Sequence, residues 1–514
     1  MKNTIMAIGT LITVVAIGWL IDSTNKRKRE KAIERQIFNC LKEAAKNGKA
    51  DAQYEIGRWY LERKDANRAL FWIGKAAKQG LAGAQFNLGL MYYNGLGVTQ
   101  DYQQAAKWFE KAAEQGIAEA QFNLGSMYRR SLGVTQDYQQ AAKWYEKAAE
   151  QGFAMAQFNL GSMYRRSLGV TQNYQQAVKW YEKAAEQGVA MAQSNLGVMY
   201  HQGLGVTQDY QQAVNWYEKA AEQGDAEAKY NLGVMYQQGL GVTRDDKQAV
   251  KWYEKAAEQG IAEAQSKLGV MYKQGLGVTQ DYQQAVKWYE KAVEQGHAKA
   301  QFNLGVMYDQ GLGVTQNYQL AANWYEKAAE QGLAEAQFNL GVMYQQGLGV
   351  TRDDKQAIKW YEMAAEHGNA EAQYNLGVMY QQGLGVTRDD KQAVKWYERA
   401  AEHGNAEVQY NLGVMYQQGL GVTQNYQLAV NWYEKAAEQG YVEAQAMLGV
   451  LYCLGKGVLK DDKLAYAWFS VAAANGHGKS VELRDDLAKL ITPTTLADAQ
   501  ALAGSYFEKY QAKQ

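Results

Sequence analysis

The sequence NLGVMYQQGLGVT occurs without change at residues 231–243, 339–351, 375–387 and 411–423, and near-copies of it fill most of the chain. The surrounding sequence repeats as well, because twelve of the fourteen tryptophans are spaced by 36 residues. The series consists of Trp72, Trp108, Trp144, Trp180, Trp216, Trp252, Trp288, Trp324, Trp360, Trp396, Trp432 and Trp468. Periodic chains stack their units instead of dividing into globular domains, so we expect one array of 36-residue units.

Each unit has the pattern of two amphipathic helices, as residues 334–369 illustrate. In the first half, Ala336 and Leu340 begin an apolar series at i, i+4, i+7 and i+8, which lies on one face of a helix. In the second half, Trp360 and Tyr361 belong to a similar series that begins at Ala357. One helix pair cannot bury both of its faces, so each unit must pack against the next. The predicted fold class is therefore all-α.

Asp or Asn stands at the start of the second helix in every full-length unit. Such a side chain accepts hydrogen bonds from the free backbone N–H groups of the first turn. The series consists of Asp101, Asp137, Asn173, Asp209, Asp245, Asp281, Asn317, Asp353, Asp389, Asn425 and Asp461. A glycine after each second helix, such as Gly116, can close it in the left-handed conformation.

A further glycine recurs inside the first helix, for example Gly89, Gly125 and Gly161. Glycine in a helix interior costs about 1 kcal/mol relative to alanine. Its recurrence predicts that a neighbouring helix approaches the backbone closely at this position. We expect the small residues Ala and Gly of one helix to face the Trp and Tyr of another.

The unit A-x-x-x-L-G-x-M-Y-x-x-G-x-G-V-x-x-D-x-x-x-A-x-x-W-Y-x-K-A-A-x-x-G resembles the Sel-one-like repeat family, which is related to tetratricopeptide repeats. The resemblance covers roughly residues 50–477 and implies a right-handed α/α superhelix (solenoid) of about twelve helix-turn-helix repeats. It also implies an adaptor or scaffold for protein complexes, in several cases at membranes. A secreted, cysteine-rich branch of the family is associated with weak β-lactam hydrolysis. This sequence has only Cys40 and Cys453, so that branch is not a guide to it.

The N-terminal segment predicts an uncleaved membrane anchor. Residues 5–21 are mostly apolar, at the short end for a transmembrane helix, and Trp19 suits a membrane interface. A cleaved signal peptide fits less well, because the run ends in Trp-Leu-Ile-Asp without small residues. The basic residues 26–29 follow the run, so the positive-inside rule places the repeats in the cytoplasm. A periplasmic or secreted location is the alternative.

We therefore divide the chain into four parts. Residues 1–25 are the anchor, and residues 26–49 are a basic linker with a capping helix. Residues 50–477 are the solenoid, whose first unit has 32 residues because its loop is shorter by four. Residues 478–514 form a helical cap, in which Thr492 and Pro493 have the pattern of an N-cap followed by the first helical residue. Such a cap covers the last apolar face of a solenoid.

A ladder of asparagines is the first candidate binding site. Asn lies on the side of the first helix that is not used for packing, and it offers a donor and an acceptor to a partner's backbone. Aromatic side chains precede it in many units. The candidate asparagines are Asn123, Asn159, Asn195, Asn231, Asn303, Asn339, Asn375 and Asn411, and the candidate aromatics are Phe122, Phe302, Phe338, Tyr374 and Tyr410. The alternative is that these asparagines bond to the neighbouring unit and only stabilise the stack.

A second candidate site is the one local departure in charge, formed by Arg129, Arg130, Arg165 and Arg166. Four arginines could bind an acidic segment of a partner. The alternative is an ordinary solvated loop region.

The sequence thus favours a membrane-anchored scaffold that binds proteins or peptides in a groove and contacts the bilayer through its N-terminal helix. The alternatives are a structural spacer, which near-identical units would suit, and an enzyme acting on cell-wall or β-lactam substrates. No catalytic or metal-ligating cluster stands out, so we expect no enzyme activity, no metal and no cofactor. With 54 basic and 54 acidic residues, the chain lacks the basic excess of a nucleic-acid binder.

Overall fold

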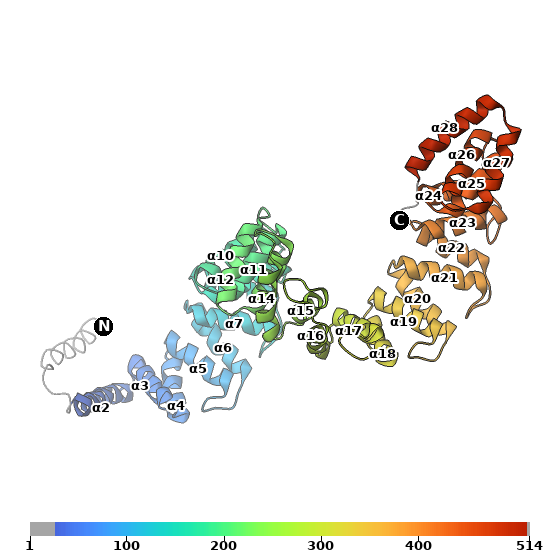
Figure 1. Cartoon of the computed structure of the whole chain (residues 1–514). Coiled ribbons are helices and arrows are strands. Elements are labelled where there is room, and N and C mark those ends of the chain that lie inside the picture. The colour runs from blue at the N-terminus through green and yellow to red at the C-terminus, as the bar shows by residue number, and fades with distance from the viewer. Residues whose placement is uncertain (1–25, 511–514) are drawn as a thin grey trace. The chain divides into compact units, whose positions relative to one another are not determined.

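The structure, a computed structural model, describes residues 26–510. Within this range it contains 27 helices, α2 to α28, and no strand (Figure 1). The chain divides into two compact units, residues 1–245 and residues 246–514, and the division falls between the two helices of one repeat. The prediction of an all-α solenoid of about twelve repeats is confirmed.

In the first unit, α2 (Lys26–Lys46) precedes the repeats. The first helices of its repeats are α3 (Ala50–Glu62), α5 (Ala82–Asn94), α7 (Ala118–Arg130), α9 (Ala154–Arg166), α11 (Ala190–Gln202) and α13 (Ala226–Gln238). The second helices are α4 (Ala66–Lys78), α6 (Tyr102–Glu114), α8 (Tyr138–Glu150), α10 (Tyr174–Glu186) and α12 (Tyr210–Glu222). Each helix packs against the helices that precede and follow it in this unit.

The second unit begins with a second helix, α14 (Asp246–Glu258). The first helices that follow are α15 (Ala262–Gln274), α17 (Ala298–Gln310), α19 (Ala334–Gln346), α21 (Ala370–Gln382), α23 (Ala406–Gln418) and α25 (Val442–Leu454). Their second helices are α16 (Tyr282–Glu294), α18 (Tyr318–Glu330), α20 (Asp354–Glu366), α22 (Asp390–Ala401), α24 (Tyr426–Glu438) and α26 (Asp462–Ala474). The chain ends with α27 (Gly478–Leu490) and α28 (Pro493–Lys509).

The helix boundaries follow the predicted signals. In α8, for example, the Asp137 carboxylate accepts a hydrogen bond from the backbone N–H of Gln140 at 2.9 Å. In the same loop the backbone N–H of Asp137 donates to the carbonyl of Tyr128, which ties the start of α8 to the end of α7. The first helices of the full-length repeats close in the left-handed conformation, at a glycine such as Gly203 or, in two repeats, at Ser131 and Ser167.

The recurrent glycine of the first helix lies against an aromatic ring, as predicted. A Cβ atom added to Gly197 would lie 2.6 Å from two ring carbons of Tyr217, and one added to Gly341 would lie 2.7 Å from Tyr361. These tyrosines are fully buried. Each is held between the first helix of its own repeat and that of the next, as Tyr145 is between α7 and α9. Burial of such a side chain contributes roughly 1.5–3 kcal/mol, which outweighs the cost of the glycine.

The tryptophan beside each tyrosine packs in the opposite direction along the chain. Trp144 of α8 joins a buried cluster with Ala105 and Phe109 of α6, in the preceding repeat. Its outer face is covered by Lys147, whose Nζ lies 4.1 Å from the ring centroid. The two neighbouring aromatic side chains therefore make different contacts. The tyrosine packs against the next repeat, and the tryptophan packs against the preceding one.

A buried glutamine near the start of each first helix also joins adjacent repeats. Gln121 Nε2 donates to the carbonyl of Ala113 in the preceding repeat at 3.0 Å, and Gln121 Oε1 accepts from Gln151 of its own repeat at 2.7 Å. Equivalent bonds involve Gln157, Gln193 and Gln265. Such a buried amide must be hydrogen-bonded, so these bonds fix the register between repeats. This series was not predicted from the sequence.

The two ends of the repeat array are covered by extra helices. At the N-terminal end, the ring centroids of Phe38 in α2 and Trp59 are 4.2 Å apart. Ala45, also in α2, is buried. At the C-terminal end, the ring of Tyr510 stacks on Trp468 and its carbonyl accepts from Gln445. The start of α28 is as predicted, with the Thr492 hydroxyl accepting from the N–H of Thr495 and proline following it.

The predicted membrane anchor, residues 1–25, lies outside the described residues. Among residues 26–510, no helix is both long enough and apolar enough to cross a bilayer.

A pair of glycine substitutions tests the helix contact. We expect Gly197→Ala to lower the free energy of unfolding by about 1–3 kcal/mol, because the new methyl group would overlap the buried Tyr217 ring. Gly74, inside α4, has no atom within 4 Å of an added Cβ. Gly74→Ala should therefore be neutral or stabilise by up to about 1 kcal/mol. Urea unfolding of both variants is the measurement, and equal effects of the two would contradict the assignment.

Candidate functional site

The candidate binding residues lie on the side of the first helices that the core does not use. In α7, the side chains of Ala120, Gln121 and Leu124 are buried, as is Gly125, whereas Arg130 is exposed. The candidate positions Phe122, Asn123 and Arg129 are half-buried, and so is Ser126 one turn after Phe122. The same pattern recurs in the other first helices. We call this surface the first-helix face, and it is considered separately in each of the two units.

The predicted aromatic residues have one side in contact with the core. The Phe122 ring lies 5.7 Å from the ring of the buried Tyr145, and the same contact recurs at 5.6–5.9 Å for the others. These are the pairs of Phe302 with Tyr325, Phe338 with Tyr361, Tyr374 with Tyr397, and Tyr410 with Tyr433. All five predicted aromatics are half-buried, so each also presents part of its surface to solvent.

Several asparagines of the ladder have partners within the chain. Asn87, which belongs to the same series, donates from Nδ2 to the Tyr54 hydroxyl of the preceding repeat at 3.1 Å. Asn411 is hydrogen-bonded to Tyr374 in the same way. The amide of Asn375 bonds to the Tyr361 hydroxyl, and that of Asn339 lies beside Tyr325.

The remaining asparagines fall into two groups. Asn159 is buried, and Asn195 donates to the Met191 carbonyl of its own helix. Asn123, Asn231 and Asn303 are half-buried, and none of them has a side-chain hydrogen bond to another residue in the part of the chain described. These three are therefore the members of the ladder whose amides are available to a partner.

A position near the end of the first helix varies more than any other on this face, and sequence reasoning did not identify it as a series. It is half-buried in all full-length repeats. We call it the variable column, and it consists of Tyr93, Arg129, Arg165, His201, Gln237, Lys273, Asp309, Gln345, Gln381, Gln417 and Cys453. Its chemistry changes from cationic to anionic to neutral, whereas the core residues of the repeats hardly change.

The variable column lies beside the hydroxyl groups of the buried tyrosines. Gln345 Oε1 accepts a hydrogen bond from the Tyr361 hydroxyl at 2.8 Å, and the equivalent bonds join Tyr397 to Gln381 and Tyr433 to Gln417. Burial raises the pKa of Tyr361 to about 12, so this hydroxyl remains protonated and donates. In these repeats the side chain of the column satisfies a buried group of the core.

Charged members of the variable column are affected by their partial burial. Burial lowers the pKa of Lys273 and raises the pKa of Asp309, the latter effect being opposed by the nearby Tyr325 hydroxyl. Burial also lowers the pKa of His201, whose ring lies 5.6 Å from that of Tyr210. The charges of Lys273 and Asp309 are thus partly desolvated, which strengthens their interaction with an opposite charge on a partner, whereas burial favours the neutral form of His201.

The predicted arginines occupy this column and the position after it. Arg129 and Arg165 are half-buried, and Arg130 and Arg166 are exposed. They end α7 and α9, where cations interact favourably with the helix dipole. The structure thus brings all four to the same end of two first helices in consecutive repeats.

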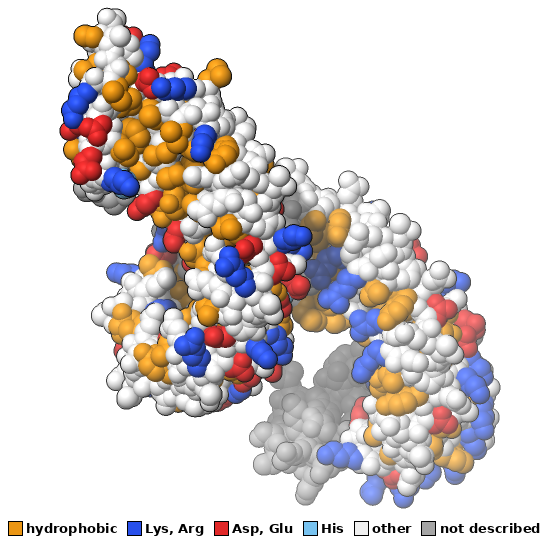
Figure 2. Space-filling model, turned by 90° about the vertical axis from the view of Figure 1, so that its right-hand side faces the viewer, with side chains coloured by type: hydrophobic (Ala, Val, Ile, Leu, Met, Phe, Trp, Pro, Cys, Tyr) orange, Lys and Arg blue, Asp and Glu red, His pale blue; other side chains and the backbone are white. Residues whose placement is uncertain are grey.

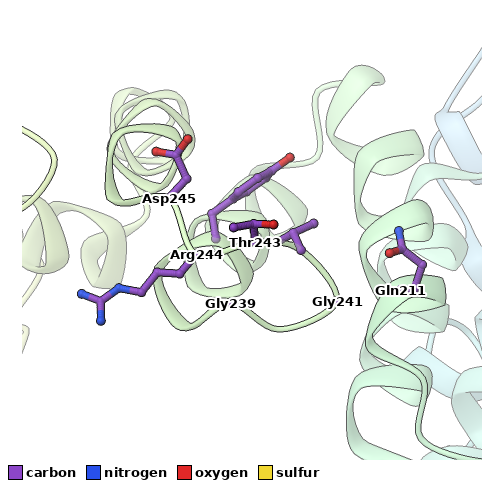
Figure 3. A pocket seen from close by; sticks show the side chains of 8 residues that line it. Gln211, Gly239, Gly241, Thr243, Arg244 and Asp245 are labelled. Atoms are coloured by element: carbon purple, nitrogen blue, oxygen red, sulfur yellow. The ribbon is translucent and has the colours of Figure 1, made fainter.

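Hollows on the surface lie where the loop of one repeat meets the preceding repeat. Figure 3 shows one such hollow of about 810 Å³, lined by Gln211 of α12 and by loop residues from Gly239 to Asp245. Arg244 points away from it. Gly241 lies against the backbone of Tyr210, so the loop itself is a joint between repeats. Within residues 26–510, no group of three His, Cys, Asp or Glu side chains is placed to hold a metal ion.

The surface as a whole carries both charge signs. Figure 2 shows acidic and basic side chains interspersed on one face, with hydrophobic side chains between them. This agrees with the balanced composition of the chain.

The asparagine series allows a direct comparison of bonded and unbonded members. We expect Asn87→Ala to lower the free energy of unfolding by about 1 kcal/mol, because it removes the bond to Tyr54. Asn303→Ala should change it by less than about 0.5 kcal/mol. Chemical denaturation measures both. A large loss of stability in the Asn303 variant would show that this amide, too, serves the fold.

Comparisons with known proteins identify the repeat. A family model described as Sel1 repeat matches twelve consecutive segments: 50–81, 82–117, 118–153, 154–189, 190–225, 226–261, 262–297, 298–333, 334–369, 370–405, 406–441 and 442–477. The chain is 43% identical to the solved structure of c5321, described as a protective antigen present in uropathogenic Escherichia coli strains displaying an SLR fold. That match covers 86% of this chain and 95% of the other, with a TM-score of 0.67.

A second solved structure, a Sel1 repeat protein from Oxalobacter formigenes, is 36% identical. The match covers 60% of this chain and 90% of that one, with a TM-score of 0.51. Among curated proteins there is no match.

Proposed function

This chain belongs to the Sel1 repeat family, and from that membership we propose that it is a scaffold that collects protein partners on its first-helix face at a membrane. Sel1 repeat solenoids generally mediate protein–protein interaction, and they are typically not enzymes. The finer parts of the proposal are the face that is used, the adaptor role and the membrane attachment.

The observation that carries the proposal is the composition of the first-helix face. It presents half-buried aromatic rings, such as Phe302 and Phe338, next to amide groups such as that of Asn303. Aromatic residues that are rigidly held and partly exposed are typical of protein interfaces, and amides supply directional hydrogen bonds. The row continues from repeat to repeat within each unit, so an extended segment of a partner could lie across several repeats.

The spacer is the second candidate, and near-identical repeats favour it. The variable column favours a scaffold instead. A spacer needs only the core contacts, yet this column carries Arg165, Lys273, Asp309 and Gln345 in otherwise similar repeats. Differences of charge at one partly exposed position are what a binding surface needs in order to distinguish partners. For the enzyme alternative, turnover of a reporter β-lactam by the purified protein would be the supporting result.

A capture experiment tests the binding face. We expect cross-linking in the native membrane to capture discrete partners with the intact protein, and less of them with the triple variant Asn123→Ala, Asn231→Ala and Asn303→Ala. These amides have no bond within the described chain, so the variant should unfold like the parent. The matched control is Asn87→Ala, whose amide is already used by Tyr54. Equal capture by the parent and the triple variant would reject the asparagines as binding residues.

Membrane attachment is proposed for residues 1–25, on the strength of the apolar run and the basic residues that follow it. The positive-inside rule supports repeats on the cytoplasmic side. The description of the Escherichia coli relative as a protective antigen supports the opposite side.

Protease treatment of intact cells and of opened vesicles tests the orientation. With the cytoplasmic orientation, the repeats are cleaved only after the membrane is opened, whereas cleavage in intact cells would establish the outward orientation. Recovery of the protein in the soluble fraction, with residues 1–25 still present, would reject the anchor.

A further inference from the structure

Two consecutive repeats differ from the others by a coordinated set of residues. Four repeats have Val-Met-Tyr-Gln-Gln-Gly and three others differ from it only at the first glutamine, whereas residues 126–131 and 162–167 both have Ser-Met-Tyr-Arg-Arg-Ser. The changes therefore replace a valine by serine one turn before the variable column and two glutamines by arginines. We call these two segments the serine–arginine block. It lies entirely within the first unit.

In the block, a serine replaces the residue of the variable column as the hydrogen-bond partner of the buried tyrosine. Elsewhere a glutamine of the column accepts the hydrogen bond of the buried tyrosine, as Gln345 does for Tyr361. In the block, the Ser126 hydroxyl is bonded to the Tyr145 hydroxyl at 3.0 Å. Tyr181 likewise donates to Ser162 at 3.1 Å, and Ser162 donates to the carbonyl of Phe158. The arginines are thus not needed to satisfy the tyrosines.

The guanidinium groups of the block have no acidic partner in the described chain. Elsewhere in the protein, Arg388 pairs with Asp390 at 2.9 Å and Arg352 with Asp354 at 3.3 Å. None of the four block arginines forms an ion pair with any residue between 35 and 510. Nε of Arg165 is moreover buried and lacks a hydrogen-bond partner there. A buried, unpaired donor of this kind is costly, so it indicates a group that a partner is to satisfy.

Two first helices, one in the block and one directly after it, lack acidic residues. Most first helices carry Glu at their second position, but α9 and α11 carry Met155 and Met191 instead and contain no acidic residue at all. Met191 is 45% exposed, which is high for a large apolar side chain. The first helices α9 and α11 therefore have no carboxylate of their own to oppose the arginines, and each carries a methionine near its start.

The next repeat continues the same surface. His201 follows Arg165 in the variable column, and the adjacent Tyr217 hydroxyl is fully buried without a hydrogen-bond partner among the described residues. Tyr217 corresponds to Tyr145 and Tyr181, whose hydroxyls lie beside the block serines. The hydroxyls of Tyr289 and Tyr325 lack a partner in the same way, so this feature is shared with repeats outside the block.

We propose that the serine–arginine block is a binding site for an acidic, extended peptide segment of a protein partner. Arg129 and Arg165 would each bind one carboxylate, since guanidinium and carboxylate form paired, charge-assisted hydrogen bonds. Arg130 and Arg166 add charge at the exposed edge. This proposal rests on the proposed function, because it names the partner chemistry for one part of the same face.

The repeat spacing sets the spacing of the carboxylates. Packed helices lie about 10 Å apart, and an extended chain advances about 3.3 Å per residue. Two carboxylates that reach equivalent positions in consecutive repeats are therefore about three residues apart in the segment. A membrane of anionic lipids would not require this spacing, so we favour a peptide.

The test uses fluorescent peptides and the purified full-length protein. The probes are Gly-Ser peptides that contain one methionine and two glutamates separated by two, three, four or five positions, with glutamine counterparts as controls. We expect tightest binding at a separation of three, loss of binding with glutamine, and weakening by salt. Failure of every glutamate peptide to bind better than its glutamine counterpart would overturn the proposal. So would equal competition by vesicles of anionic lipid for the same arginines.

Two variants with the same change of charge separate the block from general electrostatics. Arg129→Gln with Arg165→Gln gives the block the residue that other repeats carry, so folding should be retained. We expect it to weaken peptide binding by about tenfold or more. Arg352→Gln with Arg388→Gln removes two charges from arginines that are already paired, and should leave the affinity unchanged. Equal losses in both variants would overturn the assignment of the site.

Transfer of the block to the second unit tests whether the block is sufficient to create a second site for acidic peptides. The substitutions are Val342→Ser, Gln345→Arg, Gln346→Arg, Gly347→Ser, Glu371→Met, Val378→Ser, Gln381→Arg, Gln382→Arg, Gly383→Ser and Glu407→Met. We expect the variant to bind two acidic peptides per chain. A stoichiometry of one, in a variant that unfolds cooperatively, would show that the block is not sufficient and would overturn its role as the binding element.

The outcomes also separate this proposal from the scaffold function. If acidic peptides do not bind but membrane capture still depends on Asn231 and Asn303, the scaffold stands and only the block assignment fails. If capture is unaffected by the asparagine substitutions and by the arginine substitutions, the scaffold function itself fails.

Discussion

The close contact between a helix glycine and a buried tyrosine is the constraint on which the remaining structure depends. Because Gly341 has no side chain, the Tyr361 ring can lie directly on the backbone of α19 and also reach the first helix of the next repeat. Tryptophan then contacts the preceding repeat, and a buried glutamine bonds across the same boundary. Each repeat is thereby joined to both neighbours by contacts that its own sequence provides.

This division of tasks leaves the first-helix face free to vary. Core positions are nearly identical along the chain because each boundary between repeats has the same geometry. The variable column lies at the edge of that core, so a change there also affects whether the hydroxyl of the buried tyrosine has a hydrogen-bond partner. Gln345 and Ser126 are two solutions, since the glutamine satisfies the hydroxyl directly and the serine leaves the adjacent Arg129 available. Surface chemistry and core stability are thus linked through one hydrogen bond.

The sequence predicts the helices, their caps and the close approach at glycine, because these follow from local periodicity and from residues with special conformations. It cannot decide which way two adjacent aromatics face, and only the structure separates Trp144 from Tyr145 in this respect. The buried Gln121 escapes sequence reasoning because an amide on an amphipathic helix resembles a surface residue. The internal bonds of Asn87 and Asn411 depend on tyrosines in the preceding repeat, which a single-unit pattern does not reveal. The sequence shows that Ser126 and Ser162 are each followed by arginines three and four residues later. Only the structure shows that these serines are hydrogen-bonded to the hydroxyls of buried tyrosines.

A double-mutant cycle on Gly197 and Tyr217 tests the central contact most directly. The free energy of unfolding would be measured for Gly197→Ala, Tyr217→Ala and the double variant. If the ring lies on the glycine, the added methyl group should cost much less once the ring is absent, with a coupling energy of about 0.5–3 kcal/mol. Additive effects of the two substitutions would mean that the glycine recurs for another reason, and would contradict this account of how the repeats are joined.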